Sequence, residues 1–144
     1  MKTLHKDKLL IHIAPSRAEM GRKAACDIAD CILRLLERKE QINMIIAAAP
    51  SQNEVLAALA EDNRIPWQRI NAFHMDEYIG LAPDAPQCFS NFLKRGIFDL
   101  KPFKSVNLIN AGATDAQAEA LELLLQKSRI HGAVNKRQYH HPTG

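Results

Sequence analysis

The sequence has few of the features that mark secreted, redox-active or metal-binding proteins. Its 144 residues include three cysteines, Cys26, Cys31 and Cys88, and no Cys-x-x-Cys pair. An odd number of cysteines without metal-ligand spacing is typical of free thiols in a reducing compartment. We therefore expect the three cysteines to be small buried hydrophobic side chains rather than catalytic groups.

Long hydrophobic runs are also missing. No apolar stretch approaches the roughly 20 residues that a membrane-spanning helix needs. Near the start of the chain only residues 9–14 are mostly apolar, which is too short for the core of a signal peptide. The sequence thus predicts a cytoplasmic protein that does not contact a membrane.

A strong charge of one sign is absent from most of the chain. The net charge is +3, but residues 127–144 hold Lys127, Arg129, Lys136 and Arg137 and no acidic residue. The remaining residues carry 15 basic and 16 acidic side chains, so they are almost neutral. This balance argues against a nucleic-acid partner. We predict one domain over residues 1–126 and a basic, disordered tail over residues 127–144.

Strand-like and helix-like segments alternate along residues 9–126. Ser16 and Glu19 have the spacing of a helix-capping box, as do Ser51 and Glu54. Strand-helix repeats with short connections predict an α/β fold with a mostly parallel sheet and right-handed crossovers. The last 18 residues contain no apolar run that would supply another strand, so we expect the sheet to be incomplete at its C-terminal end. The expected strands are 9–13, 42–48, 69–73 and 105–109.

Two adjacent acidic residues, Asp76 and Glu77, follow the expected third strand. The carboxyl ends of parallel strands are where open α/β sheets bind their ligands, and a carboxylate there is suited to abstract a proton next to a carbonyl. The alternative is structural, with Asp76 capping a turn and Glu77 in solvent. His74 is either a metal ligand together with the acids or, as we favour, a side chain that packs at the strand end.

The turn after the expected second strand is a candidate anion site. Free backbone N–H groups and the helix dipole at a helix N-terminus both attract phosphate, and the residues of this turn are small. The turn lacks glycine, however, and Glu54 lies in the first turn of the helix. On spacing alone, an ordinary capped helix is the interpretation that we favour.

Three segments resemble the glucosamine-6-phosphate deaminase/isomerase and 6-phosphogluconolactonase family: residues 46–54, residues 72–81 and residues 90–93. The Met-Asp-Glu-Tyr sequence at 75–78, followed by Gly80 and Leu81, resembles the deaminase branch in particular. Residues 108–113 also resemble that branch, and the resemblance extends over most of residues 9–126. It implies a Rossmann-like α/β sandwich with helices on both faces of the sheet.

The resemblance also implies a reaction, the conversion of glucosamine-6-phosphate into fructose-6-phosphate and ammonia. Asp76 would move a proton between C1 and C2 of the open-chain sugar phosphate, and Glu77 would support it. The phosphate would bind at Ala49, Pro50, Ser51 and Gln52, through the Ser51 hydroxyl and backbone N–H groups. No metal and no organic cofactor are expected. The partner would be a small-molecule sugar phosphate, and the sequence leaves open whether the protein forms a homo-oligomer.

The chain departs from the family pattern in two places. The family usually has paired glycines where this chain has Ala49 and Pro50, and after residue 126 the family's strand and glycine-rich segment with a catalytic histidine do not follow. His131, His140 and His141 do not stand in that motif. We therefore expect a truncated protein with weak or no turnover. The alternatives are a hydrolase similar to 6-phosphogluconolactonase and a non-catalytic sugar-phosphate-binding module.

Overall fold

The computed structural model describes residues 1–112, 115, 119, 120, 122 and 123. The predicted tail over residues 127–144 lies outside the described residues, and the domain boundary at residue 126 stays a prediction.

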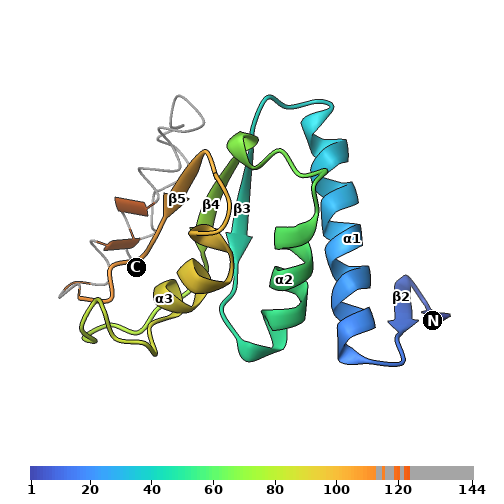
Figure 1. The fold of residues 1–144 in the computed structure, drawn as a ribbon, viewed down its shortest axis with the longest axis horizontal. Coiled ribbons are helices and arrows are strands. Elements are labelled where there is room, and N and C mark those ends of the chain that lie inside the picture. Colours follow the sequence, from blue (N-terminus) through green and yellow to red (C-terminus); the bar gives the residue numbers. More distant parts are fainter. Residues whose placement is uncertain (113–114, 116–118, 121, 124–144) are drawn as a thin grey trace, which may run out of the picture.

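A three-stranded parallel sheet forms the centre of the fold (Figure 1). It contains β3 (Ile42–Ile46), β4 (Ile70–His74) and β5 (Ser105–Asn107), in the spatial order β3-β4-β5. The β4 residue Ile70 pairs with Ile42 of β3, and Asn71 pairs with Ser105 of β5. The predicted parallel α/β fold is therefore confirmed, with strand bounds that differ by one or two residues from those expected.

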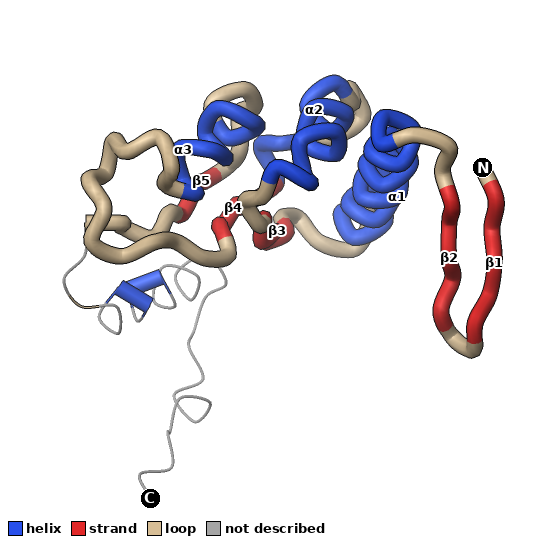
Figure 2. Tube along the Cα trace, turned by 90° about the horizontal axis from the view of Figure 1, so that it is seen from below, coloured by secondary structure: helices blue, strands red, loops and turns tan. Residues whose placement is uncertain are grey.

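Helices cover both faces of this sheet (Figure 2). On one face lie α1 (Arg17–Leu36), α2 (Asn53–Glu61) and α3 (Phe89–Leu93), and α3 continues as a π-helical turn over Lys94–Phe98. The helical residues 119, 120, 122 and 123 lie on the opposite face. None of the helices in the described part of the chain is long and apolar enough to span a membrane.

The hydrophobic core lies between the sheet and the first three helices. Ile70 and Ala72 of β4 are fully buried there and belong to the same cluster as Ala29 of α1 and Leu56 and Leu59 of α2. Because side chains alternate along a strand, Asn71 of β4 faces the other side of the sheet. There its amide oxygen accepts a hydrogen bond from the Ser105 hydroxyl at 2.8 Å.

Helix α1 begins as the sequence predicts. Ser16 has an extended backbone, and its hydroxyl accepts the N–H of Glu19 at 3.2 Å. The second predicted capping box is wrong, because Pro50–Gln52 form a 3₁₀ turn and α2 starts only at Asn53.

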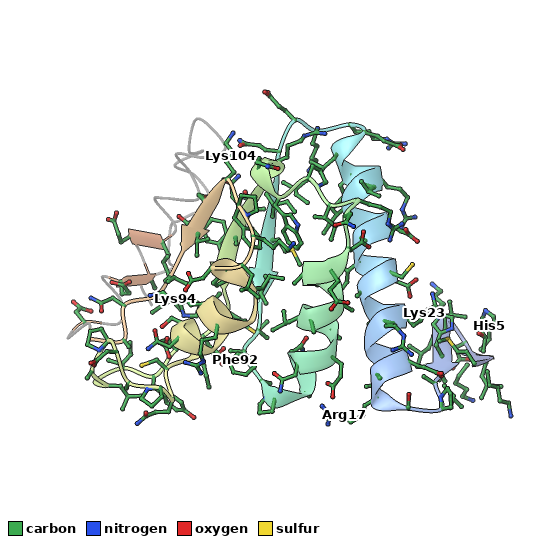
Figure 3. The ribbon with its side chains drawn as sticks, in the orientation of Figure 1. His5, Arg17, Lys23, Phe92, Lys94 and Lys104 are labelled. Atoms are coloured by element: carbon green, nitrogen blue, oxygen red, sulfur yellow. The ribbon has the colours of Figure 1, made fainter. Side chains whose placement is uncertain are left out.

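Glu54, the acid of the second predicted box, instead binds a side chain from a neighbouring helix. Its two carboxylate oxygens each accept a hydrogen bond from the Arg17 guanidinium, both at 2.8 Å. Arg17 lies at the start of α1, beside the turn that leads into α2 (Figure 3). The ion pair thus links the N-terminal ends of the two helices.

The first predicted strand has the expected bounds but a different partner. β2 (Leu9–Ile13) pairs antiparallel with β1 (Lys2–Lys6) and forms a hairpin separate from the parallel sheet. Asp7 adopts a positive φ of 53° between the two strands, which an aspartate tolerates better than most residues. This local turn favours pairing with β1.

The expectation that all three cysteines are buried is also wrong. Only Cys88 is buried, whereas Cys26 and Cys31 are exposed on α1. Five positions along a helix correspond to a rotation of about 140°, so two such residues cannot both face the core squarely.

We predict that Gly21→Ala destabilises the protein by about 2 kcal/mol. Helix propensity alone would favour alanine by about 1 kcal/mol. A Cβ at Gly21, however, would lie 2.5 Å from Glu54 Cβ and 2.9 Å from the Glu54 carbonyl carbon, so α1 and α2 would have to move apart. Urea unfolding measures the change in the free energy of unfolding.

The control is Arg22→Ala, on the exposed side of the same helix turn, which we expect to change stability by less than about 0.5 kcal/mol. A stabilised Gly21→Ala variant would contradict the close contact between the two helices.

Candidate functional site

The candidate phosphate turn and the acidic motif leave the sheet at the same edge. Ile46 and His74, the last residues of β3 and β4, are register partners. The N–H of Met75 then donates to the Ile46 carbonyl oxygen at 3.0 Å, so the two chains run together for one more residue. The parallel pairing of β3 and β4 therefore brings residues 49–52 and residues 76–77 to one side of the molecule.

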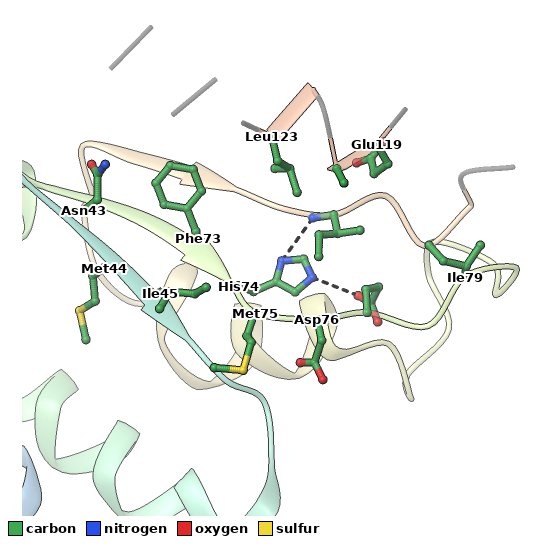
Figure 4. Close-up of a pocket in the computed structure, with 13 residues that line it drawn as sticks. Asn43, Met44, Ile45, Phe73, His74, Met75, Asp76, Ile79, Glu119 and Leu123 are labelled. Atoms are coloured by element: carbon green, nitrogen blue, oxygen red, sulfur yellow. Dashed lines mark hydrogen bonds and ion pairs between the residues drawn. The ribbon is translucent and has the colours of Figure 1, made fainter. Parts of the chain in front are cut away.

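A groove of about 700 Å³ opens on the face of the sheet opposite α1 and α2 (Figure 4). Its walls are mostly apolar, and its polar groups are concentrated at the carboxyl end of β4. Phe73, Asp76, Ile109, Glu119 and Leu123 are among the residues that line it. Ala49, Pro50, Ser51 and Gln52 do not line this groove, so the two predicted sites share a sheet edge but not a cavity.

Asp76 is the exposed member of the acidic pair. It lies two residues beyond the end of β4, lines the groove, and its carboxylate accepts no hydrogen bond from the described part of the chain. A carboxylate without a protein partner is available to bind a ligand or to take up a proton. The predicted placement of this acid just past the strand end is confirmed.

Glu77 is placed very differently, and the alternative that it lies in solvent is wrong. Its side chain is fully buried. One carboxylate oxygen accepts the N–H groups of Tyr78 at 3.0 Å and Phe89 at 2.8 Å, and the other accepts that of Ser90 at 2.8 Å. Phe89 and Ser90 are the first residues of α3, whose N–H groups have no partner within the helix. Glu77 therefore ties the acidic motif to the start of α3.

Burial by itself would raise the pKa of Glu77, because a desolvated carboxylate prefers its neutral form. The hydrogen bonds from the backbone N–H groups of Ser90, Phe89 and Tyr78 act in the opposite direction and outweigh burial, so the pKa lies below its ordinary value. Glu77 is thus held as an anion whose oxygens are already occupied by the protein.

His74 packs at the end of β4, as the sequence favours. Its ring is buried, and Nδ1 accepts the N–H of Ile109 at 3.3 Å. Nε2 lies 3.6 Å from a carboxylate oxygen of Glu77 (Figure 4). Burial lowers the pKa of His74 despite the opposing charges of Glu77 and Asp76. Within the described residues, no group of three or more His, Cys, Asp or Glu side chains is placed to hold a metal ion.

The candidate phosphate turn is compact. The N–H of Gln52 donates to the Ala49 carbonyl oxygen at 2.9 Å, and that of Asn53 donates to the Pro50 carbonyl oxygen. Proline has no N–H group, so these bonds leave few donors for an anion. The guanidinium of Arg17 lies beside this turn, but its charge is paired with Glu54.

Sequence reasoning did not identify Glu119 as part of the site. Its carboxylate accepts the N–H of Asn110 at 2.7 Å, and the residue lines the groove opposite β4. The local sequence carries no signal for this contact, because it depends on how residues beyond β5 fold back over the sheet.

The chain is similar to curated glucosamine-6-phosphate deaminases. It is 45% identical over 60 residues to the protein of an Exiguobacterium species, a match that covers 42% of this chain and 24% of the relative. The Proteus mirabilis protein is 33% identical over 85 residues, covering 57% and 31%. The Streptococcus suis protein is 28% identical over 110 residues, covering 76% and 44%. The chain thus spans less than half the length of these relatives.

Solved structures with the same fold include a monomeric glucosamine-6-phosphate deaminase, with a TM-score of 0.66 and 20% identity over 83% of this chain and 50% of that one. A 6-phosphogluconolactonase from Thermotoga maritima has a TM-score of 0.69 and 19% identity, covering 82% and 52%. No family model matches the chain. The resemblance seen in the sequence is confirmed, and it extends over part of each relative.

We predict that Glu77→Ala lowers the free energy of unfolding at neutral pH by about 3 kcal/mol, because three N–H groups lose a charged acceptor. The contribution of the Glu77 carboxylate to the stability of the wild-type protein should depend on pH. Since the folded pKa lies below the ordinary value of 4.5, this stability is present above about pH 4.5 and is lost as the pH falls through the folded pKa.

Urea unfolding between pH 7 and pH 3 tests both expectations, and Glu77→Gln should show a weaker loss of stability in acid. The control is Glu61→Gln at the exposed end of α2. If Glu61→Gln and Glu77→Gln changed the pH dependence of stability equally, the buried Glu77 carboxylate would not hold the acidic motif against α3.

Proposed function

Because the chain is related to the glucosamine-6-phosphate deaminase/isomerase and 6-phosphogluconolactonase family, we propose that it binds a sugar phosphate at the carboxyl edge of its sheet, with Asp76 as the catalytic base. One observation carries this proposal. Within the described part of the chain, the carboxylates that line the groove are those of Asp76, Glu77 and Glu119. Glu77 and Glu119 accept hydrogen bonds from backbone N–H groups, whereas Asp76 accepts none from the described residues.

The proposed reaction consumes one water and converts glucosamine-6-phosphate into fructose-6-phosphate and ammonia. In the open-chain sugar, a base removes the proton from C2 and an enol-type intermediate forms. The proton is returned to C1, and water then releases the amine as ammonia. A single carboxylate within reach of both carbons can perform both transfers. Asp76 is suited to this role because it is exposed at the groove while its neighbours in the chain are held by the fold.

Glu77 has a different role in this proposal. Its oxygens are occupied by three N–H groups, so it supports the loop that presents Asp76 and does not itself take a proton. The proposed proton transfer uses no metal, so the proposal requires no metal ligands at the groove.

The phosphate is assigned to Ala49, Pro50, Ser51 and Gln52 at the same sheet edge, with the Ser51 hydroxyl and neighbouring N–H groups as donors. The Arg17 charge beside this turn is balanced by Glu54, and some N–H groups are used within the turn. We therefore expect weak phosphate binding. Weak phosphate binding would in turn keep the turnover low, and we place this activity in the cytoplasm.

Two alternatives remain, and the comparisons bear on the first, a 6-phosphogluconolactonase-like hydrolase. The curated relatives at 28–45% identity are named deaminases, which supports deamination over hydrolysis of 6-phosphogluconolactone. The solved lactonase at 19% identity shares the fold alone. A non-catalytic sugar-phosphate-binding module is the second alternative, and it would bind the ligand without any need for Asp76.

We predict that Asp76→Asn lowers the rate of fructose-6-phosphate and ammonia formation from glucosamine-6-phosphate by at least about 100-fold, because the amide cannot act as a base. The thermal stabilisation by glucosamine-6-phosphate should persist in the variant, since the phosphate contacts are unchanged. A coupled assay and a thermal shift series measure the two effects.

Asp84→Asn, in the exposed loop after the motif, is the control and should behave as wild type. Full turnover by Asp76→Asn would exclude Asp76 as the base. Ligand stabilisation with no turnover in the wild type would favour the binding module, and equal turnover of 6-phosphogluconolactone would favour the lactonase.

A further inference from the structure

Asp76 lies in a segment that three separate elements hold in place. The N–H of Met75 binds the Ile46 carbonyl oxygen of β3. Glu77 binds the first N–H groups of α3. His74 accepts the N–H of Ile109, two residues beyond β5. Both chain neighbours of Asp76 are therefore fixed, although its own carboxylate is exposed.

His74 connects two of these anchors. Its imidazole lies between the N–H of Ile109 and the Glu77 carboxylate (Figure 4). Since Nδ1 accepts a hydrogen bond, that nitrogen carries no proton, and the proton of the neutral ring is on Nε2. Nε2 faces the Glu77 oxygen at 3.6 Å, just beyond hydrogen-bond distance, and makes no hydrogen bond within the described part of the chain.

The ring cannot act on a substrate directly. The His74 side chain is 1% exposed, and both nitrogens face protein groups. Any effect on chemistry at the groove must therefore pass through Glu77 and through the backbone that joins His74 to Asp76.

We propose that neutral His74 is a positioning residue for Asp76. The His74 ring couples the segment after β5 to the contacts of Glu77 with α3, and so fixes the backbone on both sides of the exposed Asp76 carboxylate. Its catalytic consequence rests on the function proposed above. The arrangement itself does not, because it consists of contacts within the protein.

The charges around the ring favour its protonated form, and burial, which opposes them, keeps it neutral. Glu77 and Asp76 face His74 from its own segment. Glu119, from the helical residues that cover the groove, is bound to the N–H of Asn110, and the β3 register partner Ile46 carries no charge. Protonation of Nδ1 would remove the only acceptor for Ile109 in this contact and would draw Glu77 away from α3.

The first test uses the unmodified protein. A ¹⁵N spectrum of the histidine side chains at pH 7 should show His74 as the neutral tautomer with the proton on Nε2. On lowering the pH through the region where His74 is protonated, the amide signals of Ile109, Phe89 and Ser90 should change together. A charged ring at pH 7, a proton on Nδ1, or amides that do not follow the ring would overturn the proposal.

The second test separates positioning from simple loss of stability. His74→Phe keeps a buried ring but removes both polar contacts, whereas His74→Asn retains an acceptor close to the position of Nδ1. His74→Phe should lower kcat by about 100-fold with little change in KM, as expected for a displaced catalytic group. His74→Asn should recover at least about tenfold of that loss.

The matched control is Asn71→Ala, on the same strand. Asn71 is buried like His74, and the variant loses the hydrogen bond from the Ser105 hydroxyl. Position 71, however, lies three residues before the end of the strand. The Asn71→Ala variant should reduce stability without changing the ¹³C chemical shift of the Asp76 carboxyl group at pH 7, whereas His74→Phe should change that chemical shift. If the two variants changed the ¹³C signal of the Asp76 carboxyl group equally, His74 would have only a structural role.

The two proposals fail separately. If the wild-type protein has no turnover, the proposed function fails, and the ¹³C chemical shift of the Asp76 carboxyl group in the His74 variants still decides whether His74 positions it. If His74→Phe does not fold, the tautomer of the wild-type ring and the His74→Asn variant decide.

Discussion

The buried carboxylate of Glu77 is the contact on which the candidate site depends. A fully buried acid is costly unless each of its oxygens is hydrogen-bonded, and here three backbone N–H groups meet that requirement. Two of them come from the first turn of α3, where such donors have no helical partner. The same contacts therefore satisfy the acid, begin the helix, and fix the loop that follows Asp76.

The sheet supplies the second constraint. Parallel pairing of β3 and β4 brings the turn after β3 and the acidic motif to one edge, as the general behaviour of open α/β sheets predicts. The groove at this edge has mostly apolar walls and a few carboxylates. The candidate phosphate turn lies outside the groove. A sugar phosphate bound in the proposed way would have its reacting carbons near Asp76 and its phosphate at the turn. The two ends of the ligand would then meet surfaces of different chemistry.

The relatives and the structure support complementary parts of this picture. Sequence similarity to deaminases supports the chemistry, and structural similarity at about 20% identity supports the fold. The chain spans about half of each of these solved relatives, so the described groove is built from one portion of the family fold. The weak binding and low turnover proposed for the chain follow from the occupied donors of the turn.

Local physical chemistry was sufficient to predict much of the protein from its sequence. Apolar runs and capping residues predicted the parallel strands, helix α1 and the position of Asp76, because strand burial and the Ser16 cap depend on neighbours in the chain. The pairing of β2 with β1, the exposure of Cys26 and the contact between Glu54 and Arg17 were not predicted. The buried state of Glu77 and the bond from Ile109 to His74 were decided only by the tertiary structure, because their partners lie 12 to 35 residues away. The sequence by itself determined which residue types stand at the end of β4. The tertiary structure decided which of the two acids is held by the protein and which is left free, since only packing brings α3 and the segment after β5 against that strand end.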